Sequence, residues 1–249
     1  GKIDIYHSSD WTQGPSKAKK VTTVHDLSPF LYPAELDAKI VEVHTAKMYW
    51  SVKECDKFIC VSQNTANDLQ RLFSVPSSKM AVIHEALEKH FLLKPQMTKY
   101  TNYVLAIGAR QPRKNIERLK KACELAQQKL IIVGEGSELG YISDQDLVNY
   151  LANASVFVYP SLYEGFGLPI LGAFQHGVPV VASNTSSIPE VVGDAGILVD
   201  PYSVEALAEG ITKAIKNRDK LTELGKKQLA KFSWQRTAEQ TLKVYESLC

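Results

Sequence analysis

The sequence has no long apolar run. None of its apolar stretches approaches the roughly 18–20 residues that a membrane-spanning helix needs. The first residues show no basic segment followed by an apolar one, so we expect no signal peptide. The four cysteines, Cys55, Cys60, Cys123 and Cys249, form no CxxC pair, which argues against a disulfide framework or a zinc knuckle. Together these absences predict a cytoplasmic protein with reduced thiols.

An excess of charge of one sign is also absent. The chain of 249 residues has 29 Lys and Arg against 27 Asp and Glu, which gives a net charge of +2. This balance excludes a protein that binds nucleic acid through bulk charge, and a hydrophobic content of 45% is too high for a disordered chain. We therefore expect a globular protein of one or two domains without a nucleic-acid partner.

Short runs rich in Val and Ile alternate with segments of helical periodicity. Candidate strands lie at 3–6, 21–25, 57–61, 79–83, 103–108, 130–133, 155–159, 178–182 and 196–199. Candidate helices lie at 35–54, 63–73, 115–128, 144–153, 168–176, 203–216, 219–231 and 234–248. Strands that are apolar on both faces need a sheet that is covered on both sides. The alternation therefore predicts an α/β fold with doubly wound parallel sheets.

A polar segment that contains proline, at about residues 86–102, fits neither the strand nor the helix period. A new series of strands and helices begins after it. We expect a first Rossmann-like lobe over residues 1–95 and a second over residues 96–249. The last helix would close the second lobe or cross to the first.

Residues 108–115, Gly-Ala-Arg-Gln-Pro-Arg-Lys-Asn, form an unusually basic loop between a predicted strand and a predicted helix. A helix N-terminus already favours an anion, and Arg110, Arg113 and Lys114 would strengthen that preference. A group with two negative charges could bind there. A solvated basic loop without a ligand is the alternative interpretation.

Residues 161–169, Ser-Leu-Tyr-Glu-Gly-Phe-Gly-Leu-Pro, form a second loop of this kind. Gly165 and Gly167 permit turns that expose backbone N–H groups, and the following helix start offers more donors. Glu164 would be repelled by a phosphate, so its useful partner is a neutral hydroxyl or a developing cation. Alternatively, Glu164 only complements the dipole of the helix.

These two loops resemble those of a known family. Residues 112–119, Pro-Arg-Lys-Asn-Ile-Glu-Arg-Leu, are similar to the phosphate-binding loop of retaining, two-lobed (GT-B) nucleotide-sugar glycosyltransferases. The particular match is the mannosyltransferase-like group 1 family of bacterial polysaccharide assembly. Residues 158–169, Val-Tyr-Pro-Ser-Leu-Tyr-Glu-Gly-Phe-Gly-Leu-Pro, resemble its donor-site signature. Stretches at 24–29, 61–65, 178–184 and 188–196 extend the resemblance over nearly the whole chain.

The resemblance implies transfer of a hexose, mannose-like, with retention of configuration. The donor would be a GDP- or UDP-linked sugar, and the acceptor a saccharide or a lipid-linked saccharide. Neither a cofactor nor a metal ion is expected, because side-chain cations would take the metal's part. An amphipathic stretch with Tyr49, Trp50 and Lys53 could meet an anionic membrane surface, although a solvated helix face is the alternative.

The resemblance also assigns roles to residues of this chain. Arg113 and Lys114, beside Gly108, would neutralise the donor diphosphate, and Glu164 would hydrogen-bond to hydroxyls of the donor sugar. His25 would face that sugar from the first lobe. The donor would also be bound by the backbone amides of Gly165, Phe166, Gly167 and Leu168.

Departures from the family pattern suggest a second interpretation. Gly172 stands where the family has the glutamate that holds the nucleotide ribose. The first lobe looks incomplete, and a helix and a strand that the family has between Glu138 and Gly140 are missing. The alternative is therefore a module that binds a nucleotide sugar or another protein with little or no transfer. A partner chain could complete its first lobe.

Overall fold

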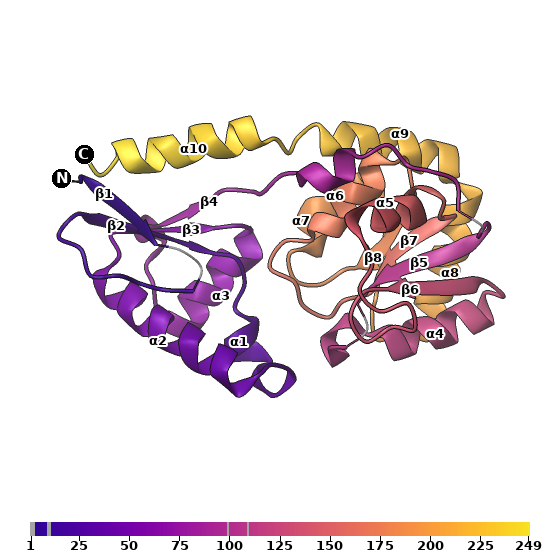
Figure 1. Cartoon of the computed structure of the whole chain (residues 1–249), viewed down its shortest axis with the longest axis horizontal. Helices are drawn as coiled ribbons and strands as arrows, with labels where there is room; N and C mark the ends of the chain where they lie inside the picture. Colours follow the sequence, from indigo (N-terminus) through magenta and orange to yellow (C-terminus); the bar gives the residue numbers. More distant parts are fainter. Residues whose placement is uncertain (1–2, 9–10, 99, 109) are drawn as a thin grey trace. The chain divides into compact units, whose positions relative to one another are not determined.

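The structure, a computed structural model, describes residues 3–8, 11–98, 100–108 and 110–249. The chain forms two compact units (Figure 1). Unit 1 comprises Gly1–Glu85 and Ser233–Cys249, and unit 2 comprises Ala86–Phe232. These bounds differ from the expected lobes, 1–95 and 96–249, chiefly because the last helix belongs to the first unit.

Unit 1 is built on a parallel sheet in the order β1-β2-β3-β4. Its strands are β1 (Ile5–Ser8), β2 (Lys19–Val24), β3 (Lys57–Cys60) and β4 (Met80–Val82). Its helices are α1 (Ser28–Leu31), α2 (Ala38–Glu54), α3 (Gln63–Phe73) and α10 (Trp234–Glu246), with short 3₁₀ turns η1 (Pro33–Glu35) and η2 (Ser77–Lys79). The side chain of Ser62 caps α3 by accepting the N–H of Thr65 at 3.0 Å, which explains where that helix begins.

The two faces of this sheet are covered by different parts of the chain. On one face Phe58 packs with Met48 of α2 and Leu69 of α3. On the other face Val21 and Ile59 pack with apolar side chains of α10, Val244 among them. Because α10 buries its apolar stripe there, it belongs to unit 1 and does not close unit 2.

Unit 2 is built on a parallel sheet in the order β6-β5-β7-β8-β9. Its strands are β5 (Tyr103–Ile107), β6 (Lys129–Val133), β7 (Val156–Tyr159), β8 (Val180–Ser183) and β9 (Ile197–Val199). Its helices are α4 (Ile116–Leu125), α5 (Asp144–Ala152), α6 (Leu168–Gln175), α7 (Ile188–Val192), α8 (Val204–Lys216) and α9 (Arg218–Leu229). Its 3₁₀ turns, among the described residues, are η3 (Lys89–Leu92), η4 (Pro112–Lys114) and η5 (Gly193–Ala195).

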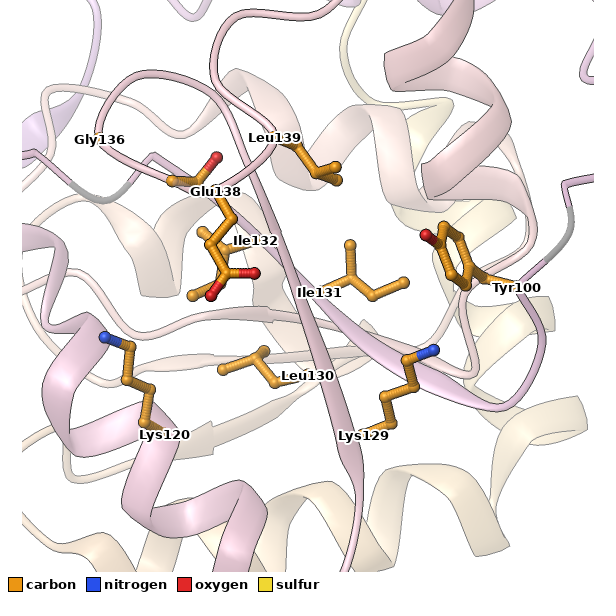
Figure 2. A pocket seen from close by; sticks show the side chains of 10 residues that line it. Tyr100, Lys120, Lys129, Leu130, Ile131, Ile132, Gly136, Glu138 and Leu139 are labelled. Carbon is orange, nitrogen blue, oxygen red and sulfur yellow. The ribbon is translucent and has the colours of Figure 1, made fainter.

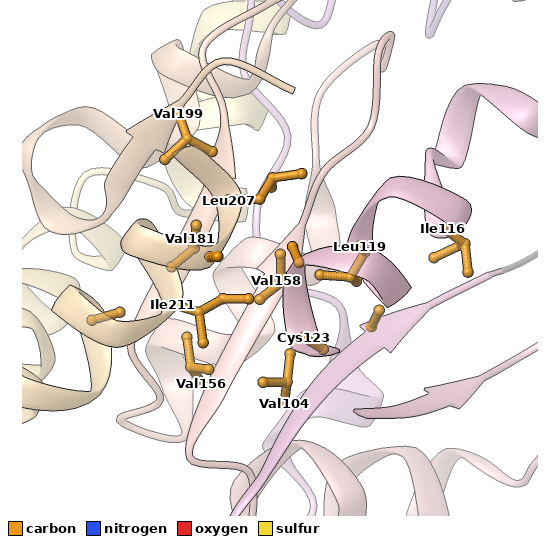
Figure 3. Packing of buried hydrophobic residues seen from close by; sticks show 14 of the residues in the cluster. Val104, Ile116, Leu119, Cys123, Val156, Val158, Val181, Val199, Leu207 and Ile211 are labelled. Carbon is orange, nitrogen blue, oxygen red and sulfur yellow. The ribbon is translucent and has the colours of Figure 1, made fainter. Parts of the chain in front are cut away.

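The main core of unit 2 lies between the sheet and helices α4 and α8 (Figure 3). Val104 and Val158 of the central strands meet Leu119 of α4 and Ile211 of α8 there. Leu105 and Phe157, whose side chains alternate with these, are also fully buried. Both faces are therefore covered, which confirms the expected α/β fold with parallel sheets.

The strand order of unit 2 reverses at β5. The chain leaves β5 toward β6 on one side, and it returns to β7 on the other. Loops that leave the carboxyl ends of two such strands diverge to opposite faces and leave a crevice between them, where open α/β sheets bind their ligands. The basic loop at 108–115 follows β5, and the glycine-rich loop at 161–169 follows β7.

Candidate functional site

The loop after β5 is bent by its backbone before it turns into η4. Gly108 has a φ of +76°, a conformation that side chains other than glycine rarely adopt. Its N–H donates to the carbonyl of Val133 at 2.7 Å, so the end of β5 remains tied to β6. The Lys114 side chain passes Gly108 at 3.9 Å from where a Cβ would lie. The loop thereby brings Lys114 beside the end of its own strand.

Asn115 holds three loops together. It has a φ of +60°, and its side-chain amide donates to the carbonyls of Pro160 at 3.1 Å and Pro201 at 2.7 Å. Arg118 donates to its side-chain oxygen at 2.9 Å. Asparagine suits this place because it tolerates the left-handed conformation and carries two donors and an acceptor. The loops after β5, β7 and β9 are therefore fixed relative to one another.

Glu164, in the loop after β7, forms ion pairs with both cations of the η4 turn. Lys114 Nζ lies 2.6 Å from its Oε1, and Arg113 lies 3.5 Å from its Oε2. Arg113 also donates to the carbonyl of Tyr163 at 3.0 Å, which fixes the guanidinium. All three charged side chains are mostly buried, with 9–19% of their area exposed. The site therefore carries two positive charges and one negative charge away from bulk water.

The pKa of Glu164 is lowered in this surrounding. Burial by itself raises the pKa, but the charges of Lys114 and Arg113 and the hydrogen bond from Lys114 outweigh it. The carboxylate is therefore ionised at neutral pH. An ionised, partnered carboxylate accepts hydrogen bonds, which suits it to sugar hydroxyls.

Tyr159, at the end of β7, packs beside Lys114 in this cluster. Its hydroxyl lies 3.5 Å from Lys114 Nζ, whose charge also lies 5.3 Å from the ring centroid. Burial and the neighbouring Glu164 raise the pKa of Tyr159 well above its ordinary value. The phenol is therefore neutral, and its oxygen accepts a hydrogen bond from the ammonium of Lys114.

Two serines form hydrogen bonds with the backbone of the glycine-rich turn that leads into α6. Gly167, with a φ of +120°, precedes the first residue of α6. Ser187 donates to the carbonyl of Phe166 at 2.9 Å, and Ser186 accepts the N–H of Glu164 at 3.0 Å. Because these bonds position the backbone, the amides at the start of α6 are presented in a fixed geometry.

The structure brings together most of the predicted donor residues. Gly108, Arg113 and Lys114 meet Glu164 at the ends of β5 and β7, and the segment with Gly165, Phe166, Gly167 and Leu168 follows directly. His25 lies in unit 1, where its Nδ1 is 3.0 Å from Oε1 of Glu85. The roles of all these residues stay predictions.

The residues that support the site are not predicted by the sequence. These are Asn115, Tyr159, Ser186 and Ser187, of which the first two stand inside the motifs. A signal existed for Asn115, because asparagine after a basic turn and before a helix is typical of a left-handed bend. The two serines had no such signal, since 22 residues separate Ser186 from Glu164.

Gly172 has a structural reason to be glycine. A Cβ built there would lie 2.5 Å from the ring of Phe91, which packs from η3 and is buried. Phe91 thus fills the space that a longer side chain on this turn of α6 would need. Residue 172 therefore lacks the family's carboxylate, and the ring of Phe91 lies in the space that such a side chain would need.

A cavity of about 420 Å³ lies elsewhere in unit 2, along β6 (Figure 2). Its lining comes from α4, β6, Tyr100 and residues 136–139 rather than from the two loops described above. Within the described part of the chain, no three His, Cys, Asp or Glu side chains are grouped to hold a metal ion. The expectation that no metal is needed stays a prediction.

Comparisons with known proteins agree with this arrangement. The family model of glycosyl transferases group 1 matches residues 93–230, and that of glycosyltransferase family 4 matches residues 1–88. The first of these matches covers more than half of the chain. This chain belongs to the group 1 glycosyltransferases. The family resemblance expected from the two loops is thereby confirmed, and so is the class of enzyme.

Relatives of this glycosyltransferase include bacterial mannosyltransferases. O-antigen chain mannosyltransferase B of Escherichia coli is 34% identical, over 98% of this chain and 74% of the relative. Serotype-specific mannosyltransferase WbdA of Escherichia coli is 28% identical over 92% of this chain, which spans only 34% of that protein. The first alignment has 283 positions, whereas 98% of 249 residues is about 244, so about 39 positions of the relative have no counterpart here.

Solved structures show the same fold as this glycosyltransferase. A glycosyltransferase from Rickettsia africae superposes with a TM-score of 0.74 at 18% identity, over 99% of this chain and 77% of that one. Sucrose-phosphate synthase from Thermosynechococcus elongatus gives 0.72 at 24% identity, over 93% and 68%. Among the described residues, no helix has the length and apolar character to cross a membrane.

Proposed function

We propose that this glycosyltransferase moves a mannosyl residue from a nucleotide-diphospho sugar to a saccharide or lipid-linked acceptor, with retention of configuration. The observation that carries the proposal is the buried cluster in which Lys114 and Arg113 face Glu164 at the ends of β5 and β7. It combines cations for a diphosphate with an ionised carboxylate for sugar hydroxyls in the crevice where such sheets bind ligands.

The chemistry follows from charge. When the bond between C1 of the sugar and the diphosphate breaks, negative charge develops on the diphosphate and positive charge on the sugar ring. Lys114 and Arg113, together with the amides at the start of α6, stabilise the departing diphosphate. Glu164 orients the sugar and lies near the developing cation. The acceptor oxygen bonds to C1 on the face that the diphosphate leaves, and its proton passes to the diphosphate.

Mannose as the transferred sugar is supported by the relatives' names, and a nucleotide-linked donor by a structure of the same fold. Besides the two Escherichia coli proteins, MMP alpha-(1->4)-mannosyltransferase of Mycolicibacterium hassiacum is 30% identical over 78% of this chain and 54% of that protein. HepE of Anabaena, which has been solved with UDP and glucose, shares the fold with a TM-score of 0.70 at 20% identity. The proposal includes no metal, because Arg113 and Lys114 supply the charge that a divalent cation would supply.

The acceptor is proposed to be presented at the cytoplasmic face of a membrane. Helix α2 has Tyr49 and Trp50 about half exposed, and Lys53 lies 4.0 Å from the centroid of the Tyr49 ring. Aromatic and cationic side chains on one surface favour an anionic lipid interface. Sedimentation with anionic vesicles tests this part, and equal binding of wild type and a Trp50→Ala, Lys53→Ala variant would reject it.

Transfer assays test the proposal as a whole. We expect Lys114→Ala and Glu164→Ala each to lower transfer from GDP-mannose at least about tenfold, because one charged hydrogen bond is worth about 1.5–3 kcal/mol. Lys213→Ala, which removes an exposed lysine of α8, is the matched control and should retain activity. Activity should also persist in EDTA. Turnover like that of the wild type in either site variant would contradict the proposal.

A second function is favoured by one observation. Gly172 offers no carboxylate to a ribose, and Phe91 occupies the space beside it. The chain could therefore bind a nucleotide sugar weakly without transferring the sugar. Calorimetry with GDP and UDP, combined with a donor-hydrolysis assay, separates the two functions, since binding without turnover supports the module and turnover supports the transferase.

A further inference from the structure

Strand β6 forms one edge of the sheet in unit 2. It pairs in parallel with β5, from Tyr103 opposite Lys129 to Ile107 opposite Val133. In the described part of the chain no strand pairs with its other side. Edge strands expose rows of backbone donors and acceptors that can pair with another strand.

The backbone groups that face outward can be identified. Val133 accepts the N–H of Gly108, so its backbone groups point toward β5. Successive residues of a strand direct their N–H and C=O groups to opposite sides. The N–H and C=O groups of Leu130 and Ile132 therefore point to the open edge.

Beyond its first residue, the exposed Lys129, β6 has no side chain that protects this edge. Edge strands are usually shortened or carry prolines and charges that prevent pairing. After Lys129 the strand reads Leu-Ile-Ile-Val, without a charge or a proline. The opposite edge of the sheet, β9, is only three residues long and is followed by Asp200 and Pro201. The contrast shows that β6 is the edge suited to pairing.

The cavity of about 420 Å³ runs along this open edge (Figure 2). Leu130, Ile131 and Ile132 form its apolar wall. Lys129 lies at the start of the strand, where its Nζ is 4.4 Å from the ring centroid of Tyr100. Beyond the end of the strand is Glu138 (Figure 2). The groove is therefore apolar along its length, with Lys129 at one end. The other end holds Glu138 and also Lys120, whose charge is balanced by Glu117 at 2.7 Å, so Glu138 makes this end acidic (Figure 2).

We propose that this edge pairs with β6 of a second copy of the chain, in antiparallel orientation about a two-fold axis at Ile131. Leu130 of one copy then lies opposite Ile132 of the other, and the two exchange both backbone hydrogen bonds. The two-fold axis generates a second pair of Leu130 and Ile132. The sheets of the two copies are thereby joined into one continuous sheet.

The distribution of charge selects a second copy and the antiparallel direction. Antiparallel pairing brings Lys129 of each copy toward the acidic end with Glu138 of the other, twice over. Parallel pairing would bring Lys129 beside Lys129. A surface with both signs at opposite ends of one short strand is complementary to itself, which is what a two-fold interface requires.

Sedimentation velocity of the full chain without donor tests the proposal. The wild type should pass from monomer to dimer as concentration rises, since association obeys mass action. Ile132→Pro removes an N–H that faces the open edge and should raise the dimer dissociation constant at least about tenfold. Lys129→Glu and Glu138→Lys should each weaken the dimer, and the double reversal should restore it. Lys213→Glu on α8 is the control for charge alone.

Circular dichroism of each variant verifies that it is folded. A wild type that stays monomeric at all concentrations would overturn the proposal. A dimer that Ile132→Pro and both single charge reversals leave unchanged would overturn it as well, because that dimer would form through another surface. None of these variants alters the loops that carry the proposed transfer, so the two proposals fail independently.

Discussion

At the scale of single residues, the charge of Glu164 connects stability to pH. Lys114 and Arg113 hold the pKa of Glu164 below its ordinary value of 4.5. The folded state therefore binds the proton less tightly than the unfolded state. The resulting stabilisation is complete above the unfolded pKa and is lost as the pH falls through the folded pKa.

Replacement of the Glu164 carboxylate should reveal how the stability of the fold depends on pH. Glu164→Gln removes the negative charge that pairs with two buried cations, and we expect it to lower the free energy of unfolding at pH 7 by about 3 kcal/mol. The gap between wild type and variant should narrow as the pH falls from about 5 toward 3. Urea titrations at several pH values measure this difference in the free energy of unfolding. Glu124→Gln, an exposed control on α4, should show no gap, and a gap for Glu164→Gln that is independent of pH would contradict the account.

Gly172 and Phe91 should behave as a coupled pair. A methyl group at residue 172 would meet the buried ring at 2.5 Å, so the ring has to move. Gly172→Ala should therefore destabilise the chain by about 1–3 kcal/mol, and Gly172→Glu by more. In a double-mutant cycle with Phe91→Leu, the combined cost should be smaller than the sum of the single costs. Simple additivity would show that the ring does not limit this position.

At the scale of elements, the sequence predicted the individual helices and strands better than the contacts between them. The expected helix 63–73 and the strands around 103–108 and 155–159 are confirmed, since apolar periodicity and caps are local signals. The ion pair of Lys114 with Glu164 spans 50 residues. It depends on β5 and β7 being neighbours, which no local pattern reveals. The apolar stripe of α10 is likewise a local pattern, and it does not indicate which of the two sheets the helix covers.

Asn115 should determine how well the loops present the site. Asn115→Asp keeps the size and the acceptor for Arg118 but loses both donors to the carbonyls of Pro160 and Pro201. Two buried carbonyls then lack a partner, at a cost of about 1–3 kcal/mol each. We expect a lower melting temperature and a KM for the donor raised several-fold. Asn115→Gly, which tolerates the same φ, should give a similar loss, and an unchanged KM in both would contradict the role.

At the scale of the whole molecule, the two units should unfold in separable transitions, because each has its own sheet and core. All three tryptophans, Trp11, Trp50 and Trp234, belong to unit 1. Tryptophan fluorescence therefore follows unit 1 alone, whereas far-ultraviolet circular dichroism follows both units. The comparison of the two signals assigns each transition without cutting the chain.

Substitutions in the two cores should then act on one transition each. Val244→Asp places a charge where α10 packs on Val21 and Ile59, so it should move the fluorescence transition to lower urea and leave a second transition in circular dichroism unchanged. Ile211→Ala, in the core of unit 2, should cost about 2–5 kcal/mol and move only that second transition. If both signals shift together in both variants, the chain unfolds as one cooperative body, and α10 transmits stability between the units rather than completing the first.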